Sequence, residues 1–224
     1  MEFSPIAHIQ TDFKEKFGIP RQSGLAPSLT ARIVFLPQYR CDDALRGLEE
    51  FSHLWLLWVF SEVGAGEWSP TVRPPRLGGN ARMGVFATRS PYRPNPIGLS
   101  VVKLERIEYD TCEGAVIVVS GADIMDGTPI LDIKPYIPYA DSKPDALGGF
   151  AVSTAQVLEV ECPKELLELI PSDKRQGLLE VLAGDPRPQY HHDPERIYTM
   201  SFADFEVSFK TDGKRLVVTA CSRS

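Results

Sequence analysis

Apolar and polar residues follow short strand-like patterns through the first two-thirds of the chain. The segments are rich in Val, Ile, Leu and Phe and are bounded by Gly or Pro, which is typical of β-strands. We predict strands over Ile6–Gln10, Thr30–Leu36, His53–Phe60, Met83–Thr88, Ile97–Glu108 and Ala115–Ser120. Only "CDDALRGLEEF", residues 41–51, has helical spacing of its apolar positions. Many short strands separated by Pro and Gly turns favour a barrel or a sandwich over alternating βαβ units.

The pattern changes near residues 162–163. The stretch "PKELLELIPSDKRQGLLEVLAG" predicts two helical segments that are split at Pro171. Two alternating runs follow, Ile197–Phe209 and Leu216–Cys221, and the Asp-Gly pair between them is a strong hairpin signal. We therefore predict a mainly β domain over residues 1–160 and a small α+β domain over residues 161–224, which would be marginal on its own.

Length and composition add few constraints. A chain of 224 residues suits one main domain with a small appendage. The longest apolar run, Leu54–Phe60, is too short for a membrane span, and "MEFSPIAHIQ" lacks the features of a secretion signal. The four cysteines are far apart and form no CxxC pair, which suits a reduced cytoplasm better than a disulfide framework or a zinc site.

Charge is distributed unevenly along the chain. The net charge is −6, yet residues 68–104 contain six basic residues and no acidic one. An even spread of the 30 acidic residues over 224 positions would put about five of them there. We call this segment the basic island; it predicts a local anion site for phosphate or carboxylate. Its basic residues are Arg73, Arg76, Arg82, Arg89, Arg93 and Lys103.

Within the basic island, "SPYRPNPIG" holds Arg93 and Asn95 between three prolines, directly after Arg89. Proline restricts both its own backbone and the residue before it, so this connector is stiff. It is either a rigid structural loop in which Asn95 starts a turn, or a loop that holds functional side chains on a β scaffold.

A second candidate stretch is "DIMDGTPILDIKPYIPYAD". Asp126 to Pro129 indicates a turn, and the Asp either caps that turn or serves a site. Asp132, Lys134 and Tyr136 occupy alternate positions and so share one face of a strand. That row is either a solvated edge or the wall of a polar site.

Common catalytic motifs are missing from the sequence. It contains no GxGxxG, no GxxxxGK[ST], no HExxH and no nucleophile box, and the adjacent His191 and His192 are a poor metal pair. An enzyme with this sequence would therefore work mainly by binding and positioning, and we expect no metal.

The sequence resembles the TsaA-like family. The resemblance is carried by "EKFGIPRQSGL", "RGLEEFSHLWLLWVF", "PTVRPPRLGGNARMGVFATRSPYRPNPIGLS" and "DGTPILDIKPYIPYAD", and the late "DPRPQY" is similar to its longer bacterial members. The resemblance implies a small β-barrel core, a homodimer and S-adenosylmethionine as cofactor. It also implies methylation of N6 of threonylcarbamoyl-adenosine, at position 37 next to the anticodon of threonine-accepting tRNAs, and hence a cytoplasmic enzyme.

The family motifs also imply site residues. Cofactor contacts are implied at Arg21, Gln22, Ser61, Glu62, Arg89, Leu99, Asp126, Gly127, Thr128 and Pro129. Some relatives have a His-Gln pair where this chain has Ser61–Glu62, so only backbone contacts would be preserved there.

Chemistry then suggests a role for each group. We predict that Asp126 orients or accepts the N6 proton, with Asn95 and Tyr136 as alternatives, and that Arg89 holds a carboxylate through paired hydrogen bonds. We expect tRNA contacts from Arg73, Arg76, Arg82, Arg93 and Tyr190 on the anticodon arm. Two alternatives stay open: a non-catalytic barrel that binds S-adenosylmethionine or RNA, and a small-molecule methyltransferase.

Overall fold

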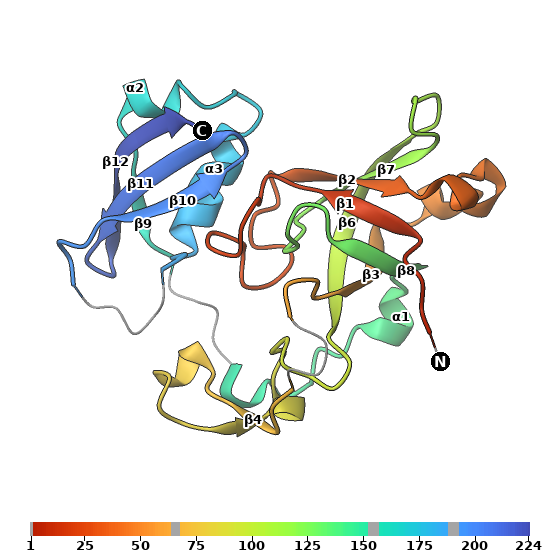
Figure 1. Ribbon diagram of the computed structural model, residues 1–224, viewed down its shortest axis with the longest axis horizontal. Helices are drawn as coiled ribbons and strands as arrows, with labels where there is room; N and C mark the ends of the chain where they lie inside the picture. Colours follow the sequence, from red (N-terminus) through yellow and green to blue (C-terminus); the bar gives the residue numbers. More distant parts are fainter. Residues whose placement is uncertain (1, 64–67, 152–156, 188–192) are drawn as a thin grey trace.

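The first part of the chain forms a closed barrel of six strands (Figure 1). The computed structural model describes residues 2–63, 68–151, 157–187 and 193–224. The strands follow the order β1-β2-β7-β6-β3-β8, and each neighbouring pair is antiparallel. Their bounds are β1 Ala7–Gln10, β2 Thr30–Phe35, β3 His53–Val59, β6 Ile97–Glu108, β7 Val116–Ser120 and β8 Pro129–Pro135. Of the two predicted architectures, the barrel is therefore the correct one.

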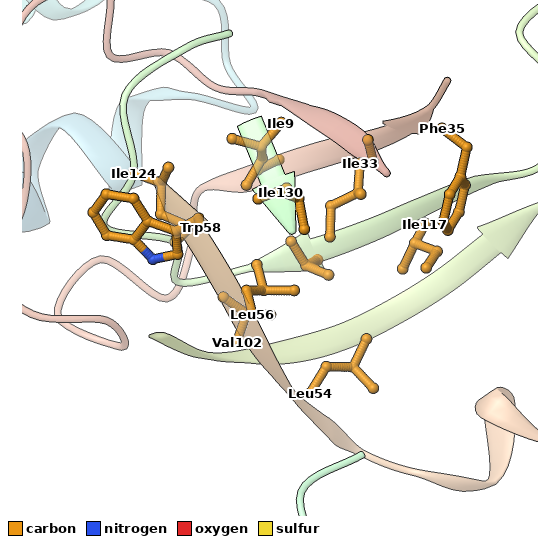
Figure 2. Packing of buried hydrophobic residues seen from close by; sticks show 14 of the residues in the cluster. Ile9, Ile33, Phe35, Leu54, Leu56, Trp58, Val102, Ile117, Ile124 and Ile130 are labelled. Carbon is orange, nitrogen blue, oxygen red and sulfur yellow. The ribbon is translucent and has the colours of Figure 1, made fainter. Parts of the chain in front are cut away.

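Alternation along the strands builds the barrel core. In β3, Leu54, Leu56 and Trp58 are buried, and the residues between them are half-exposed. Ile9, Ile33, Ile117, Ile124 and Ile130 come from other segments and meet them inside the barrel (Figure 2). The predicted strands therefore agree closely with the observed ones, apart from Met83–Thr88.

That predicted strand is shorter than expected. Only β5 (Met83–Gly84) pairs, with β4 (Thr71–Val72), and Val85–Ala87 form a 3-10 turn. The N–H of Val85 still donates to the carbonyl of Pro70, 3.0 Å away, but Pro70 has no N–H to return, so the ladder ends.

The predicted helix over residues 41–51 is also wrong. The chain forms two 3-10 turns there, Asp42–Leu45 and Leu48–Glu50. Gly47 lies between them with a φ of 84°, a left-handed conformation that interrupts a helix.

The last part of the chain forms a four-stranded sheet in the order β10-β11-β12-β9, covered by short helices (Figure 1). The elements are β9 Glu159–Glu161, β10 Tyr198–Phe202, β11 Phe205–Thr211, β12 Arg215–Arg223, α2 Lys164–Leu167 and α3 Arg175–Ala183. The hairpin at Asp212–Gly213 is confirmed. The predicted single run Ile197–Phe209 is instead two strands, because Phe202 pairs with Phe205 and Ala203, with a φ of 53°, makes a tight turn.

Residues 11–29, which we call the strap, join the barrel to this sheet. Phe13, Ala26 and Leu29 are buried in the hydrophobic core of the second part. Leu29 packs so closely on α3 that a Cβ at Gly177 would lie 2.1 Å from its side chain. The strap thus supplies core residues to the small second part, whose own apolar surface is limited.

The short helix α1 (Pro138–Asp141) follows the barrel. Among the described residues, no helix is long and apolar enough to cross a membrane. Within the same residues, no group of three or more His, Cys, Asp or Glu side chains is arranged to hold a metal ion.

Candidate cofactor pocket and its surroundings

A cavity of about 530 Å³ opens beside the barrel, next to the end of β3 and the start of β6. Its walls come from the strap, from residues 58–63 and 97–99, from the stiff loop at 88–93 and from the segment before β8. Aromatic and aliphatic side chains form much of the lining, and several charged groups converge on it. This combination of apolar walls and a few polar groups is typical of a small-molecule site.

The cavity gathers many of the residues that the sequence assigns to a cofactor. It is lined by Arg21, Gln22, Ser61, Glu62, Arg89, Leu99 and Thr128. Asp126, Gly127 and Pro129 do not line it, although they form the turn that positions Thr128. That turn was predicted correctly, since Gly127 has a φ of 74° and the Thr128 hydroxyl donates to the carbonyl of Met125 at 2.7 Å.

Polar contacts connect the stiff loop to the strap. The guanidinium of Arg89 donates to the side-chain oxygen of Gln22. The Nη2 of Arg21 donates to the carbonyls of Asp185 and Arg187, at 3.0 and 3.1 Å. The cavity wall is therefore held in place by both parts of the chain, and Arg21 is also a link between them.

The carboxylate of Asp126 is bound by residues of the strap. One carboxylate oxygen accepts the N–H of Thr11 at 2.9 Å, and the other is 2.7 Å from the ammonium of Lys14. Its own N–H donates to the carbonyl of Phe13 at 2.8 Å. Asp126 therefore anchors the strap to the turn before β8.

The other two predicted catalytic side chains lie outside the cavity lining. Asn95 is exposed in the stiff loop, and its carbonyl accepts the N–H of Ile97 at 2.8 Å. Tyr136 packs on Trp55 and His53, with ring centroids 5.7 and 6.3 Å apart. His53 and Val59 are at opposite ends of β3, which puts Tyr136 roughly 20 Å along the strand from the cavity at about 3.3 Å per residue. None of Asp132, Lys134 and Tyr136 is among the residues that line the cavity.

One carboxylate in the lining was missed by sequence reasoning. Asp123 accepts a hydrogen bond from the Ser100 hydroxyl at 2.6 Å, and Ser100 accepts one from the indole N–H of Trp58 at 3.0 Å. Burial raises the pKa of Asp123, while the Ser100 hydroxyl and the positive charge of Arg89 oppose that rise. A Cβ at Gly98 would lie 2.2 Å from the Trp58 ring, so only glycine admits the indole there.

The predicted tRNA contacts fall into three groups. Arg73 and Arg82 are exposed, and Arg82 has a 3.4 Å contact to the Thr71 hydroxyl. Arg93 lines the cavity and donates to the carbonyl of Thr88 at 2.7 Å. The side chain of Arg76 and the whole of Tyr190 lie outside the part of the chain that the structure describes.

The fold and the cavity define the protein as a small-molecule-binding antiparallel β-barrel, with its pocket beside the barrel. It is not a parallel α/β protein, in which ligands bind at the carboxyl edge of the sheet. Two family models match the chain, the tRNA-methyltransferase O N-terminal domain over residues 8–142 and the TrmO C-terminal domain over residues 151–224. The chain belongs to the tRNA-methyltransferase O family.

Individual relatives agree with this assignment. The chain is 46% identical over 221 residues to the tRNA (adenine(37)-N6)-methyltransferase of Escherichia coli K12, covering 93% of this chain and 92% of that one. It is 38% identical over 201 residues to the human protein of the same name, covering 86% of this chain and 42% of that one. A crystal structure of TrmO from Pseudomonas aeruginosa superposes with a TM-score of 0.80 at 35% identity, covering 99% and 98% of the two chains.

Proposed function

We propose that this protein is an S-adenosylmethionine-dependent methyltransferase that acts on N6 of adenosine 37 in tRNA. We further propose that the substrate is N6-threonylcarbamoyl-adenosine in threonine-accepting tRNAs, in the cytoplasm. The main support is the cavity, which collects seven of the predicted cofactor residues from separate segments of a chain that belongs to this family.

The lining residues suit this cofactor chemically. A cavity of about 530 Å³ is within the roughly 300–1,000 Å³ of small-molecule sites. Arg89 can bind a carboxylate with two parallel N–H groups. Phe60 and Tyr92 offer aromatic surface, and Glu62 provides negative charge for a cationic sulfur or ammonium group.

When bound, S-adenosylmethionine supplies an electrophilic methyl group on a positively charged sulfur. The residues of the chain contribute alignment and a dry environment, because charge on sulfur is lost as the methyl group moves. Arg89 fixes one end of the ligand, and its hydrogen bond to Gln22 keeps the guanidinium oriented. Trp58 and Phe60, with ring centroids 4.3 Å apart, exclude water from the inner wall.

Arginines outside the cavity support the proposal of a tRNA substrate. Arg73 and Arg82 are exposed in the basic island, where they can reach phosphates without disturbing the barrel. Arg93, by contrast, lines the cavity itself and donates to the carbonyl of Thr88 at 2.7 Å. For Arg76 and Tyr190 the same role stays a prediction from the sequence.

We also propose that the protein is a homodimer. Leu99, in the cavity lining, is 54% exposed, and Tyr92 and Ile97 of the same lining are exposed too. Phe86, two residues before the lining residue Thr88, is 76% exposed. Exposed apolar groups of this size around a ligand site are typical of a surface that a second chain covers. Sedimentation equilibrium of the protein tests this point; a monomer at all concentrations would contradict it.

Methyl transfer tests the proposed activity. The protein is incubated with methyl-labelled S-adenosylmethionine and bulk tRNA, and cofactor binding is measured separately by calorimetry. We expect label in tRNA and binding that persists after treatment with a chelator. Binding without transfer would favour the non-catalytic barrel, and transfer to small molecules alone would favour a small-molecule methyltransferase.

A further inference from the structure

A directed chain of hydrogen bonds ends at Asp123 in the cavity wall. The indole N–H of Trp58 donates to the Ser100 oxygen at 3.0 Å, and the Ser100 hydroxyl is 2.6 Å from an oxygen of Asp123. An indole nitrogen can only donate, so the Ser100 oxygen accepts from it, and its single proton is left for Asp123. The chain has one direction, and it fixes the orientation of the carboxylate.

Asp123 keeps capacity for a further partner. A carboxylate has about four acceptor positions. The Ser100 hydroxyl and the backbone N–H groups of Asp123 itself and of Ser23 use three of them. Burial raises the pKa of this carboxyl group, and Arg89 limits the rise. Among the described residues of the lining, the other charged groups are Lys16, Arg21, Glu62 and Arg93.

The proposed reaction needs a proton acceptor in this cavity. N6 of threonylcarbamoyl-adenosine carries one hydrogen, which must leave when the nitrogen gains a methyl group. Asp126 is paired with Lys14 and lies outside the lining, as do Asn95 and Tyr136. Among the described lining residues the carboxylates are Glu62, which is exposed, and Asp123, which is partly buried.

We propose that Asp123 is the catalytic residue that accepts the N6 proton, and that Ser100 and Trp58 are its positioning residues. The inference rests on the proposed function. The electron pair of N6 forms the new N–C bond, and the C–S pair stays with sulfur as a neutral thioether. The N6 proton passes to the Asp123 carboxylate and from there to solvent. A raised proton affinity suits this role, since a base works best when its pKa approaches the working pH.

The test compares Asp123→Asn with a matched control, Asp132→Asn. Asp132 is on the outer face of β8, paired with Lys134 at 2.9 Å. For each protein we would measure cofactor affinity by calorimetry and kcat on tRNA as a function of pH. We expect Asp123→Asn to bind cofactor within a few-fold of wild type but to lose about 10²–10⁴-fold in kcat. It should also lose the acidic limb of the pH profile of kcat. The control should keep both the wild-type kcat and the acidic limb.

A second readout is independent of catalysis. Carbon-detected NMR of the ligand-free protein titrates Asp123 directly, and we expect its pKa to lie above the ordinary aspartate value. Ser100→Ala should raise it further, because the serine hydroxyl stabilises the ionised form. The same variant should shift the acidic limb of kcat to higher pH. Ser100→Ala keeps the Asp123 carboxylate, so its pH profile tests the role of Asp123 even if Asp123→Asn does not fold.

The outcomes separate the two claims. If the wild-type protein transfers no methyl group to tRNA, the proposed function fails, and the inference fails with it. If wild type is active and Asp123→Asn stays within a few-fold of it, Asp123 is not the acceptor, although the function stands. Equal losses of affinity and kcat would make Asp123 a cofactor contact and would also overturn the inference.

Discussion

Replacing Gly98 with alanine would make the new methyl group overlap the ring of Trp58. The new Cβ would lie 2.2, 2.4 and 2.5 Å from three ring atoms. Carbon atoms in contact are normally about 3.5–4.0 Å apart, so the indole would have to move by more than about 1 Å. Trp58 is 7% exposed in the barrel core and donates to Ser100, so it cannot move without losing contacts.

The expected cost follows from this overlap. Overpacking of a core typically destabilises by about 1–3 kcal/mol. For a protein of this size, about 1 kcal/mol lowers Tm by roughly 2–4 °C, which gives a decrease of roughly 2–12 °C. Trp58 and Gly98 both line the cavity, so displacing the indole should weaken cofactor binding as well.

Urea unfolding, thermal melts and calorimetry would measure these effects. Gly84→Ala is the matched control, because a Cβ there meets nothing within 4 Å and the φ of −57° suits any residue. We expect the control to stay within about 0.5 kcal/mol of wild type. Wild-type stability and affinity in Gly98→Ala would refute the argument that this glycine is required by the indole.

Four further predictions can be checked with standard assays. Arg89→Lys should weaken cofactor binding about ten- to a hundredfold in calorimetry, because a point charge cannot form the paired contact; Arg46→Lys, on an exposed ion pair, should not. Leu29→Ala should cost about 2–5 kcal/mol in urea unfolding, since it removes a buried side chain of the second core; a loss below about 1 kcal/mol would mean that the strap is not part of that core. Arg73→Glu should flatten the salt dependence of tRNA binding in filter-binding assays by about one log–log unit or more, and an unchanged slope would exclude this contact. The free energy of unfolding, measured against pH, should fall for wild type relative to Asp123→Asn as pH rises from about 4 through the raised pKa of Asp123. The reason is that the folded protein holds the Asp123 proton more tightly than the unfolded chain does. Parallel curves for the two proteins would contradict this.

Local patterns were sufficient to predict the barrel strands but not all the connections. Alternation in β3 fixes which side chains face inward and is readable residue by residue. In β6 the buried positions include Gly98 and Ser100, and the alternation breaks at the irregularity between Leu104 and Arg106. The turn at Ala203–Asp204 has no glycine or proline to mark it. The parallel pairing of β9 with β12 depends on contacts distant in sequence. The division of the chain at residue 160 stays a prediction, and the strap, which contributes to the second core, crosses it.

The site was predictable where a residue type or a family motif carried a signal. Arg89 and Gln22 are distant in sequence, and motif resemblance identified both; the structure adds their hydrogen bond. Asp123 carries no such signal, because a single acid in an apolar stretch has many explanations. Its candidacy depends on Ser100 of β6 and Trp58 of β3, whereas Asp123 itself lies in the irregular segment before β8. Such a chain of side chains can be seen only in three dimensions.

Nucleoside mass spectrometry of tRNA shows directly whether the protein methylates adenosine 37. Threonine tRNA that carries N6-threonylcarbamoyl-adenosine but no methyl group on N6 is incubated with the protein and S-adenosylmethionine, then digested to nucleosides. We expect this nucleoside to gain one methyl group, on N6 of the adenosine at position 37, and tRNA without the threonylcarbamoyl group to gain none. An unchanged nucleoside, or a methyl group at another position, would contradict it.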